Sequence, residues 1–526
     1  MKKIKIGFLL NGNFVDKYNY ELAKWIKKEN KKFISTSFIS IPSTKKNLNY
    51  KKIPKKILFK FLVFIEFFLL KIINRHINHN EKFDLRKIIK KKIEIKNTSN
   101  QLNHINKKDF NKIKDEKFDI IIRANDGILK GKILKCSKFG VISFHHGDYT
   151  KFRGSPAGFW EVFFKEKNTG FIIQKIDDTL DYGKIIFEGF FQTKSFFLLN
   201  QAELYEKSNF YFKKFLLDLY IKQKLSFIKK KRKGKIFETP KIINQLKYIF
   251  QTFKLLSKRI LSNNYNFKLA LFNLKKINLP TIYDTKTNNF IADPFLIKHK
   301  DQTFCFAEEF SHERKMGHII CINLKKNTRN IVLKEDFHLS FPFIFEYKNK
   351  FFMCPDTSKI SEIRLYKCVQ FPLRWKFYKT IKKKINSVDN IIFKKNNLWW
   401  LLTNIDQSNT GDFSHDLSIF YSKSGPLTNK WKDHSLNPIK INSSDSRNAG
   451  IIIEKNKITR ISQVQGFDNY GEGINFHKIK TLSINKYNEE IFTNKQFIKI
   501  KKYLNNADIH HYSKVGDNIM VDFKYK

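Results

Sequence analysis

The sequence is poor in several residue types that mark special classes of protein. Glycine (20) and proline (11) are scarce among 526 residues, which excludes collagen-like and Gly/Pro-rich low-complexity chains. The five cysteines form no CxxC pair, so the sequence predicts neither a disulfide scaffold nor a zinc ribbon, and no metal site. A reducing compartment is therefore expected, and we predict a cytoplasmic protein.

Negative charge and arginine are also in short supply. There are 48 acidic residues against 101 basic ones, a formal net charge of +53, and only 12 of the basic residues are arginine. Such a field attracts nucleic acid and anionic lipid. Proteins that recognise bases and phosphates specifically use mainly arginine, however, because its guanidinium makes two parallel hydrogen bonds. The basic residues here are mostly lysines, spread along the chain. We interpret the charge as a solvated surface and expect no specific nucleic-acid partner.

Hydrophobic and aromatic residues are plentiful, at 41% and 15% of the chain, which excludes a disordered protein and predicts two or more folded domains. The apolar stretch 57–73 is interrupted by Lys60, Glu66 and Lys71. It is therefore expected to pack on the protein or to lie at a membrane surface rather than to cross a membrane. The second alternative would place the protein at the inner face of an anionic membrane.

Three regions differ in their patterning. Residues 1–225 alternate strand-like and helical runs, including strands at 4–10, 33–41, 118–123 and 140–145 and a helix at 20–31, which predicts an α/β domain with a parallel sheet. Residues 226–264 contain a basic hinge and a linker helix over 242–261. Residues 265–526 change to many short strands.

The third region contains a repeat. A strand, a polar turn and an aromatic strand recur with starts near residues 292, 340, 388, 448 and 508. A spacing of this size is typical of the blades of a β-propeller, so we predict five blades; an irregular β-sandwich is the alternative.

The first region contains an ordered set of unusual residues. They are Gly140, Ile142, His145, Phe152-Arg153-Gly154, Thr169-Gly170 and Leu180-Asp181-Tyr182-Gly183. A histidine at the carboxyl end of a parallel strand lies where open α/β sheets bind ligands. This set resembles the formyltransferase family, which includes methionyl-tRNA, glycinamide ribonucleotide and sugar-nucleotide formyltransferases.

The resemblance implies transfer of a formyl group from 10-formyltetrahydrofolate to a primary amine. His145 would accept a proton from the amine, Asp181 would orient His145, and Ser143 stands where the family has an oxyanion-binding asparagine. The resemblance also implies binding of substrate or cofactor by His146, Gly147, Asp148, Arg153 and Gly154.

The third region resembles the propeller-like N-terminal region of glucosamine inositolphosphorylceramide transferases, through strings such as Ala292-Asp293-Pro294-Phe295 and Trp399-Trp400-Leu401-Leu402. Five-bladed glycosidase propellers carry acids at blade starts, where Asp293 matches a general base and Asp389 an auxiliary acid. The acid expected at the start of the fourth repeat is missing, and Asp356 is the nearest substitute. The residues predicted to line the funnel are Asp293, Glu309, His318, Asp356, Asp389, Arg447, Arg460, Gln463 and His510.

Together these features predict a formyltransferase-like enzyme that modifies an amino sugar or sugar nucleotide in surface-glycan synthesis, with the propeller holding the carbohydrate. Initiator tRNA is a rival acceptor. A non-catalytic carbohydrate-binding protein of glycan assembly, with a degenerate formyl site, is the alternative.

Overall fold

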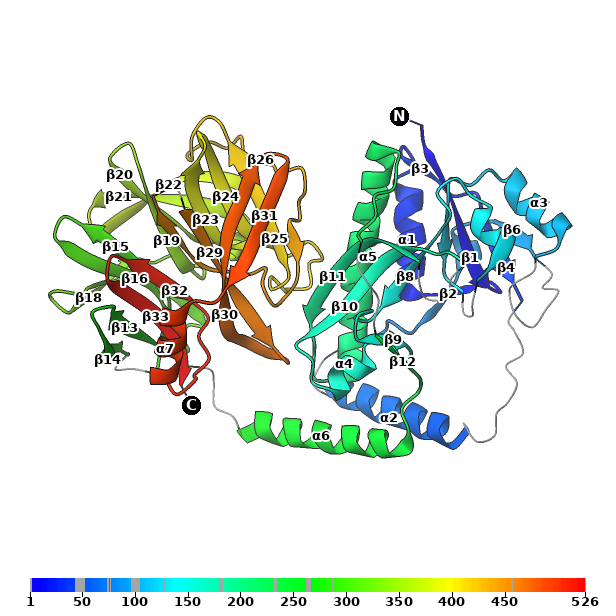
Figure 1. Cartoon of the computed structure of the whole chain (residues 1–526), viewed down its shortest axis with the longest axis horizontal. Helices are drawn as coiled ribbons and strands as arrows, with labels where there is room; N and C mark the ends of the chain where they lie inside the picture. The colour runs from blue at the N-terminus through cyan, green and yellow to red at the C-terminus, as the bar shows by residue number, and fades with distance from the viewer. Residues whose placement is uncertain are drawn as a thin grey trace. The chain divides into compact units, whose positions relative to one another are not determined.

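The structure is a computed structural model that describes residues 2–42, 53–72, 75, 77–95, 105–125, 129–178, 183–229, 234–261, 266–285, 288–455 and 457–525. The chain divides into two compact units, Met1–Ile260 and Leu261–Lys526 (Figure 1).

Unit 1 is built on one mixed sheet in the order β11-β10-β8-β7-β1-β4-β6, with β3 beside β1. The strands from β8 to β6 are parallel, whereas β10 and β11 form an antiparallel edge. The strands are β1 (Ile4–Asn11), β3 (Phe33–Ile34), β4 (Ser37–Ile41), β6 (Lys91–Glu94), β7 (Ile120–Arg123), β8 (Val141–His146), β10 (Asn168–Lys175) and β11 (Lys184–Gln192). Two short pairs accompany the sheet, β2 (Phe14–Asp16) with β5 (Lys82–Asp84), and β9 (Phe152–Gly154) with β12 (Lys235–Phe237).

The described residues of unit 1 also form the α-helices α1 (Lys17–Lys28), α2 (Ile53–Ile72), α3 (Lys107–Asp115), α4 (Phe159–Phe163), α5 (Phe197–Lys222) and α6 (Ile242–Leu261). The bounds of α6 are those predicted from its apolar spacing. The predicted strand 33–41 is two strands, because the chain stops pairing at Ser35 and Thr36. Among the described residues, no helix is long and apolar enough to cross a membrane.

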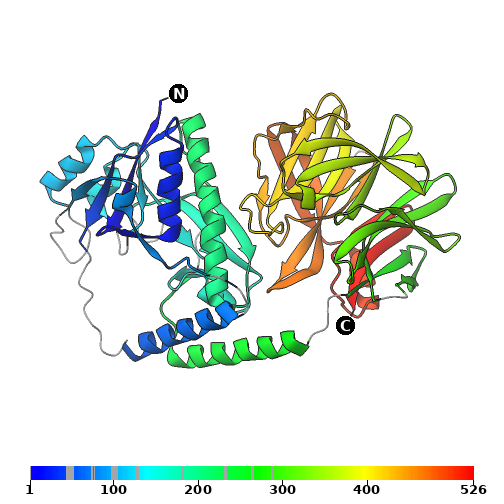
Figure 2. The ribbon, with the colours of Figure 1, turned by 180° about the vertical axis from the view of Figure 1, so that it is seen from behind.

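Unit 2 is a five-bladed β-propeller, which confirms the blade number predicted from the repeats (Figure 2). The first strands of the blades, β15, β19, β23, β28 and β32, contact one another in a closed ring. The first blade contains β15 (Phe290–His299), β16 (Gln302–Ser311), β17 (Met316–Asn323) and β18 (Thr328–Leu333), and the second contains β19 (Ser340–Tyr347), β20 (Lys350–Asp356), β21 (Glu362–Gln370) and β22 (Arg374–Lys383). The third contains β23 (Ser387–Lys395), β24 (Leu398–Ile405), β25 (Asp416–Ser422), β26 (Lys432–Asp433) and β27 (Lys440–Ile441), and the fourth contains β28 (Asn448–Glu454), β29 (Lys457–Gly466), β30 (Asn469–Ser483) and β31 (Lys486–Phe492). The fifth contains β14 (Lys276–Tyr283), β13 (Asn266–Asn273), β33 (Asn518–Tyr525) and β32 (Tyr512–Val515). Helix α7 (Lys495–Tyr503) precedes β32.

The fifth blade contains strands from both ends of the unit. Strand β13 pairs with β33 along its whole length, from Asn266 opposite Tyr525 to Asn273 opposite Asn518. The start and the end of the propeller sequence are therefore held in one sheet, and this pairing closes the ring.

The inner strands share an irregularity that positions polar residues. A bulge interrupts the pairing of β15, β19, β23 and β28 at equivalent places. Each of these bulges contains a residue with positive φ: 52° at Asp293, 47° at Phe341, 55° at Asp389 and 121° at Gly450. A non-glycine residue in this region carries strain of about 1 kcal/mol or more, which persists when the surrounding structure requires it.

Helices α2 and α6 lie side by side in unit 1, as both views show (Figures 1 and 2). The Gln245 side chain of α6 donates to the Lys55 carbonyl of α2 at 2.8 Å. Between the helices, Glu66 accepts hydrogen bonds from the Leu198 N–H at 3.1 Å and from the Tyr248 hydroxyl at 3.3 Å. Burial raises the pKa of Glu66 to about 8, so this carboxyl is protonated at neutral pH.

Glu66 is expected to make the stability of unit 1 depend on pH. The folded state holds the proton more tightly than the unfolded state, whose pKa is the ordinary 4.5. This contribution is complete below pH 4.5 and disappears as the pH rises through about 8. Glu66→Gln should remove this dependence. Between about pH 6 and about pH 9, the free energy of unfolding in urea should fall by about 2 kcal/mol more in the wild type than in the variant. Glu238→Gln, at an exposed carboxylate that pairs with Lys55, is the control and should show no such difference.

Candidate functional site

Five buried carboxylates gather at the centre of the propeller: Asp293, Glu308, Asp356, Asp389 and Asp522. None is more than 7% exposed, and they interact electrostatically with one another. Buried charges must be paired or neutralised. The partners of each carboxylate therefore decide which of them are ionised.

The first group joins Asp293, His510 and Asp522. The His510 ring places Nε2 3.4 Å from Asp293 Oδ1 and Nδ1 3.0 Å from Asp522 Oδ1. Asp522 also accepts the backbone N–H groups of Asp293 at 3.0 Å and of His510 at 3.2 Å. Burial acts against the charged forms, but the mutual attraction holds the pKa of His510 above its ordinary value and that of Asp522 below it. Asp522 is thus ionised near neutral pH, and its charge favours the protonated form of His510.

Asp293 has a different protonation state from Asp522. Burial and the nearby Asp522 charge raise the pKa of Asp293 to about 7, although His510 lowers it. Two carboxylates on one imidazolium cannot both ionise freely, so the proton affinity is divided unequally between them.

The second group joins Asp389 and Arg447. Arg447 Nε donates to Asp389 Oδ2 at 2.6 Å, and its guanidinium lies 5.0 Å from the centre of the Tyr470 ring. The Asn448 amide donates to the Asp389 carbonyl at 2.9 Å, which fixes the left-handed backbone there. Asp389 is therefore held in place by both its side chain and its backbone.

Within the described part of the chain, no lysine or arginine forms an ion pair with the two remaining carboxylates, Glu308 and Asp356. Burial and the neighbouring carboxylates raise the pKa of Glu308 well above its ordinary value and that of Asp356 to about 6. The Glu308 Oε1 lies 3.7 Å from the Nε2 of His338, whose Nδ1 accepts the Gly317 N–H. Burial lowers the pKa of His338 to about 4, so this imidazole is neutral and Glu308 stays protonated.

The group of Asp293, His510 and Asp522 also has the residue types of a metal site, with ligand atoms within 4.8 Å of one another. Both ring nitrogens of His510 already face carboxylates, and the protonated ring supplies positive charge between them. Asp522 is further occupied by backbone N–H groups. We therefore interpret this group as an ion-pair network.

Three predicted funnel residues, Glu309, His318 and Arg460, lie elsewhere. Glu309 follows Glu308 on β16, so its side chain points to the opposite face; it pairs with Arg329 and lies 3.4 Å from His318. Burial opposes ionisation, but these partners and Asn289 lower the pKa of Glu309 to about 2.

Arg460, which the sequence predicts to line the funnel, is instead enclosed in the fourth blade. Its guanidinium donates to both oxygens of Glu489, at 2.6 and 2.8 Å, and to the Asp445 carbonyl at 2.7 Å. Arg460 thus stabilises the fourth blade. Gln463 lies beside the central group, since it hydrogen-bonds Tyr470 and accepts from Gln465 at 3.1 Å.

The sequence analysis missed Glu308 and Asp522. The signal available for Asp522 was its place in the second strand of the fifth repeat, whose first segment contains His510. For Glu308 there was only the Glu308-Glu309 doublet, and without the strand register either residue could face the centre.

In unit 1, strand β8 carries Ser143, His145 and His146 at the predicted strand end. The Ser143 hydroxyl donates to the Phe144 carbonyl at 2.8 Å. Burial lowers the pKa of His146 to about 3, and its Nε2 lies 2.9 Å from the Ser208 hydroxyl among Tyr18, Phe144 and Tyr205. The His146 ring is therefore neutral and packed among aromatic rings, and both His146 and His145 are half-buried.

The other predicted residues of this motif mainly shape the backbone. Asp148 Oδ1 accepts from the Thr150 N–H at 2.9 Å and from its hydroxyl at 2.6 Å, a local turn. Gly147 is left-handed, with φ of 142°. Glu161, which the sequence analysis left without a role, accepts the Asp148 N–H at 3.1 Å, and burial raises its pKa to about 7.

Arg153 and Gly154 hold the chain after the basic hinge. Arg153 Nε donates to the Gly234 carbonyl at 2.7 Å. A Cβ at Gly154 would lie 2.1 Å from the Phe237 carbonyl oxygen, so the pairing of β9 with β12 requires glycine there. Asp181 lies outside the described residues.

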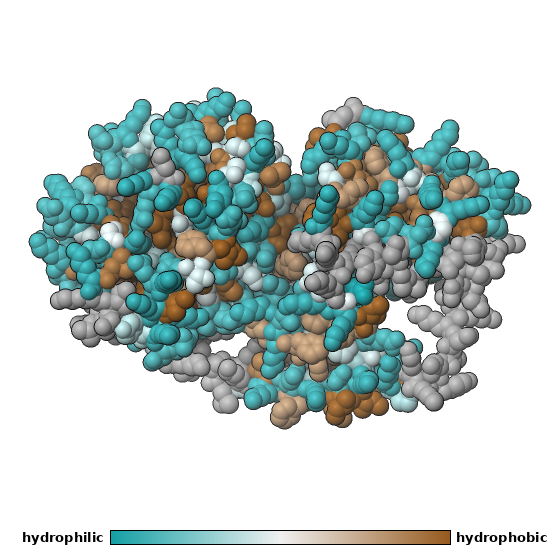
Figure 3. All heavy atoms as spheres, viewed as in Figure 1, coloured by the Kyte–Doolittle hydropathy of each residue, from teal (hydrophilic) through white to brown (hydrophobic). Residues whose placement is uncertain are grey.

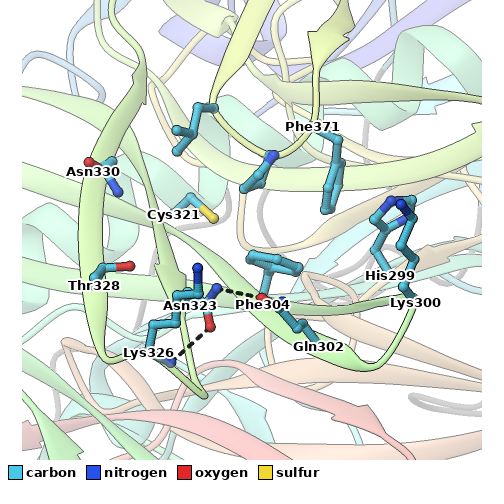
Figure 4. A pocket seen from close by; sticks show the side chains of 12 residues that line it. His299, Lys300, Gln302, Phe304, Cys321, Asn323, Lys326, Thr328, Asn330 and Phe371 are labelled. Atoms are coloured by element: carbon cyan, nitrogen blue, oxygen red, sulfur yellow. Dashed lines mark hydrogen bonds between the residues drawn. The ribbon is translucent and has the colours of Figure 1, made fainter.

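A separate hollow in unit 2 lies beside the first blade (Figure 4). The centre of the Phe371 ring lies 4.5 Å from that of His299 and 5.2 Å from that of Phe304. Gln302 accepts from the Asn323 amide at 2.8 Å at its rim. No carboxylate is among the described residues that line it, so this hollow lacks the acid and base groups of the centre.

Comparison with known proteins finds sequence relatives of the propeller. Residues 280–517 match the family model described as glucosamine inositolphosphorylceramide transferase 1, N-terminal. The propeller resembles the N-terminal region of that transferase. The Arabidopsis thaliana protein of this name is 35% identical over 235 residues, which are 43% of this chain and 30% of that protein. The Oryza sativa subsp. japonica protein is 33% identical over 210 residues, 38% of this chain and 28% of that protein. The chain thus spans less than a third of these relatives.

Solved structures give only remote similarities. The family 117 glycoside hydrolase Zg3597 of Zobellia galactanivorans is 10% identical with a TM-score of 0.32, over 49% of this chain and 90% of that one. The sugar 3N-formyl transferase WlaRD is 13% identical with a TM-score of 0.28, over 62% of this chain and 99% of that one. Neither score supports a conclusion about chemistry.

The family match contradicts the predicted formyl transfer, the predicted formyltransferase class and 10-formyltetrahydrofolate as the donor. The relatives are named as glucosamine inositolphosphorylceramide transferases, not as formyltransferases. The predicted alternative, a non-catalytic carbohydrate-binding protein, gains no better support. A transferase with a β-propeller and a glycan or sugar substrate agrees with these relatives.

Asp522→Asn should destabilise unit 2, because it leaves the protonated His510 without its ionised partner in a buried place. We expect a loss of about 3 kcal/mol in the free energy of unfolding at neutral pH, as for other broken buried pairs. Chemical unfolding followed by tryptophan fluorescence measures it. Asp517→Asn, in the exposed turn before the same strand, is the matched control and should cost less than about 1 kcal/mol. Equal effects of the two substitutions would contradict the network.

Proposed function

We propose that this protein takes part in glycosyl transfer and that the central carboxylates of the propeller bind the glycosyl substrate and exchange protons with it. The observation that carries the proposal is the unequal ionisation of neighbouring carboxylates at one place. Glu308 is protonated, Asp522 is ionised, and the pKa of Asp293 is about 7. Carboxyl groups whose environments separate their pKa values are suited to act as acid and base together.

In the proposed reaction, the bond between the anomeric carbon and the leaving oxygen breaks, and a bond to an acceptor oxygen forms. Protonated Glu308 donates its proton to the leaving oxygen, and Asp293 takes the proton of the acceptor hydroxyl. A pKa near 7 suits this second role, since the group is partly ionised at neutral pH and still basic.

Asp389 and Arg447 would position the sugar. The ion pair fixes the Asp389 carboxylate, whose free lone pairs can accept hydrogen bonds from sugar hydroxyls, and its negative charge favours the positive charge that develops on the sugar ring. Similarity to a transferase named for glucosamine supports an amino sugar as the transferred group.

Single substitutions on one strand test the proposal. Glu308→Gln should lower glycosyl transfer by about a hundredfold or more, because an amide cannot donate the proton as an acid does. Glu309→Gln, its neighbour with the opposite orientation, should change the rate by less than about threefold. The assay follows label from a sugar nucleotide of glucosamine or N-acetylglucosamine into inositol-phosphate lipids, read by mass spectrometry. Equal rates in the wild type and Glu308→Gln would contradict the role of Glu308.

Asp293→Asn distinguishes binding from catalysis. If Asp293 is the base, the variant should still bind glucosamine in saturation-transfer NMR while transfer falls by about a hundredfold. The wild-type rate should rise with pH through about 7 as Asp293 ionises, and this limb should be absent in the variant. A rate limb near pH 7 that persists in Asp293→Asn would assign the titration to another group.

A further inference from the structure

Helices α2 and α6 carry an unusual concentration of exposed apolar side chains. Single exposed apolar residues are ordinary on protein surfaces, but a contiguous patch marks an interaction site. Phe64 of α2 is 65% exposed and Phe250 of α6 is 72% exposed. The exposed large apolar residues are Ile57, Phe61, Phe64, Ile65, Phe67, Phe68 and Ile72 on α2, and Ile242, Ile243, Leu246, Phe250 and Phe253 on α6.

On α2 these residues form one face. Ile57, Phe61, Phe64, Phe68 and Ile72 recur at every third or fourth position, which places them along one side of a helix. A different side, with Leu62, Glu66 and Leu70, is buried in unit 1. The helix is therefore attached to its domain by one side and presents aromatic rings to the surroundings on another.

Helix α6 repeats the arrangement. Ile242, Leu246, Phe250 and Phe253 recur with the same spacing, whereas Gln245 and Tyr248 face inward. The hydrogen bonds of Gln245 to α2 and of Tyr248 to Glu66 hold the two helices together. Apolar residues gather along the two helices (Figure 3). We call the exposed apolar residues of both helices the α2/α6 surface.

The charges of these helices indicate which kind of partner the α2/α6 surface binds. Each helix contains four basic residues, and their only acidic residue is Glu66, which is buried and neutral because its pKa is about 8. Lys56, Lys60 and Lys71 are exposed on α2, and Lys247 and Lys254 on α6. A helix face of large apolar side chains with lysines beside it is complementary to the interface of a lipid bilayer with anionic headgroups.

We propose that the α2/α6 surface binds membranes that contain anionic phospholipids, with both helices lying in the plane of the interface. The aromatic and aliphatic side chains enter the boundary between headgroups and acyl chains, and the lysines contact phosphates. This binding is separate from the chemistry of the propeller and would bring the protein to lipid-linked substrates. It does not depend on which sugar the propeller takes.

Vesicle sedimentation with the full chain tests the proposal. The wild type should sediment with vesicles of phosphatidylcholine containing roughly one third phosphatidylglycerol, and at least about tenfold more weakly with phosphatidylcholine alone. Sodium chloride at about 0.5 M should weaken the binding, because exposed charges are then screened. Failure of the wild type to bind anionic vesicles would overturn the proposal.

Two variants separate the apolar and the charged contributions. Phe61→Ser, Phe64→Ser and Phe68→Ser combined should reduce binding at least about tenfold, since the three rings are exposed in the free protein and their loss leaves the core intact. The control combines Ile331→Ser, Val369→Ser and Ile491→Ser, at comparably exposed positions of the propeller, and should bind as the wild type does.

Lys56→Glu, Lys60→Glu and Lys71→Glu combined should likewise reduce binding at least about tenfold. Lys376→Glu, Lys379→Glu and Lys384→Glu, an equal charge change on exposed propeller residues, is the control. If both lysine variants lose binding equally, the general charge of +53 is responsible and the proposal is wrong. It is also wrong if the serine variant converts a dimer to a monomer in light scattering while vesicle binding is unchanged, because the surface then joins two copies of the chain.

Discussion

Pairing between the first and last strands of unit 2 is the constraint on which the propeller depends. β13 and β33 lie together along their full lengths, and Asp522 of β33 accepts the N–H of Asp293 from the next blade. A ring of blades that is open at one seam would leave two sheet edges and a buried carboxylate without partners. The residues that close the ring are therefore also the residues that shape its centre.

The centre shows how a protein interior divides protons among similar groups. Five carboxylates meet two cationic side chains, His510 and Arg447, in a buried volume where all of them cannot be ionised at once. The attraction of His510 lowers the pKa of Asp522, whereas burial and neighbouring carboxylates raise the pKa values of Asp293, Glu308 and Asp356. The bulges matter here because they turn Asp293 and Asp389 toward the axis from positions where a regular strand would place a different residue.

Unit 1 illustrates why a motif does not establish a reaction. Several residues predicted for the formyltransferase-like site have structural partners: Ser143 its neighbouring carbonyl, His146 a group of aromatic rings, Asp148 a turn, and Arg153 the strand after the hinge. These contacts position the backbone around β8, and the roles expected of His145 and Asp181 stay predictions. The sequence relationship of the propeller, by contrast, extends over residues 280–517.

The sequence alone determined features that depend on local order. The repeated strand, turn and aromatic strand specified five blades, the apolar spacing specified α6 to the residue, and the repeat starts identified Asp293 and Asp389. Only the tertiary structure decided that Glu308 and not Glu309 faces the centre, that Arg460 pairs with Glu489, and that Asp522 joins His510. The reason is that the face presented by a strand residue depends on register and bulges, and its partner comes from a strand distant in sequence, neither of which local pattern specifies.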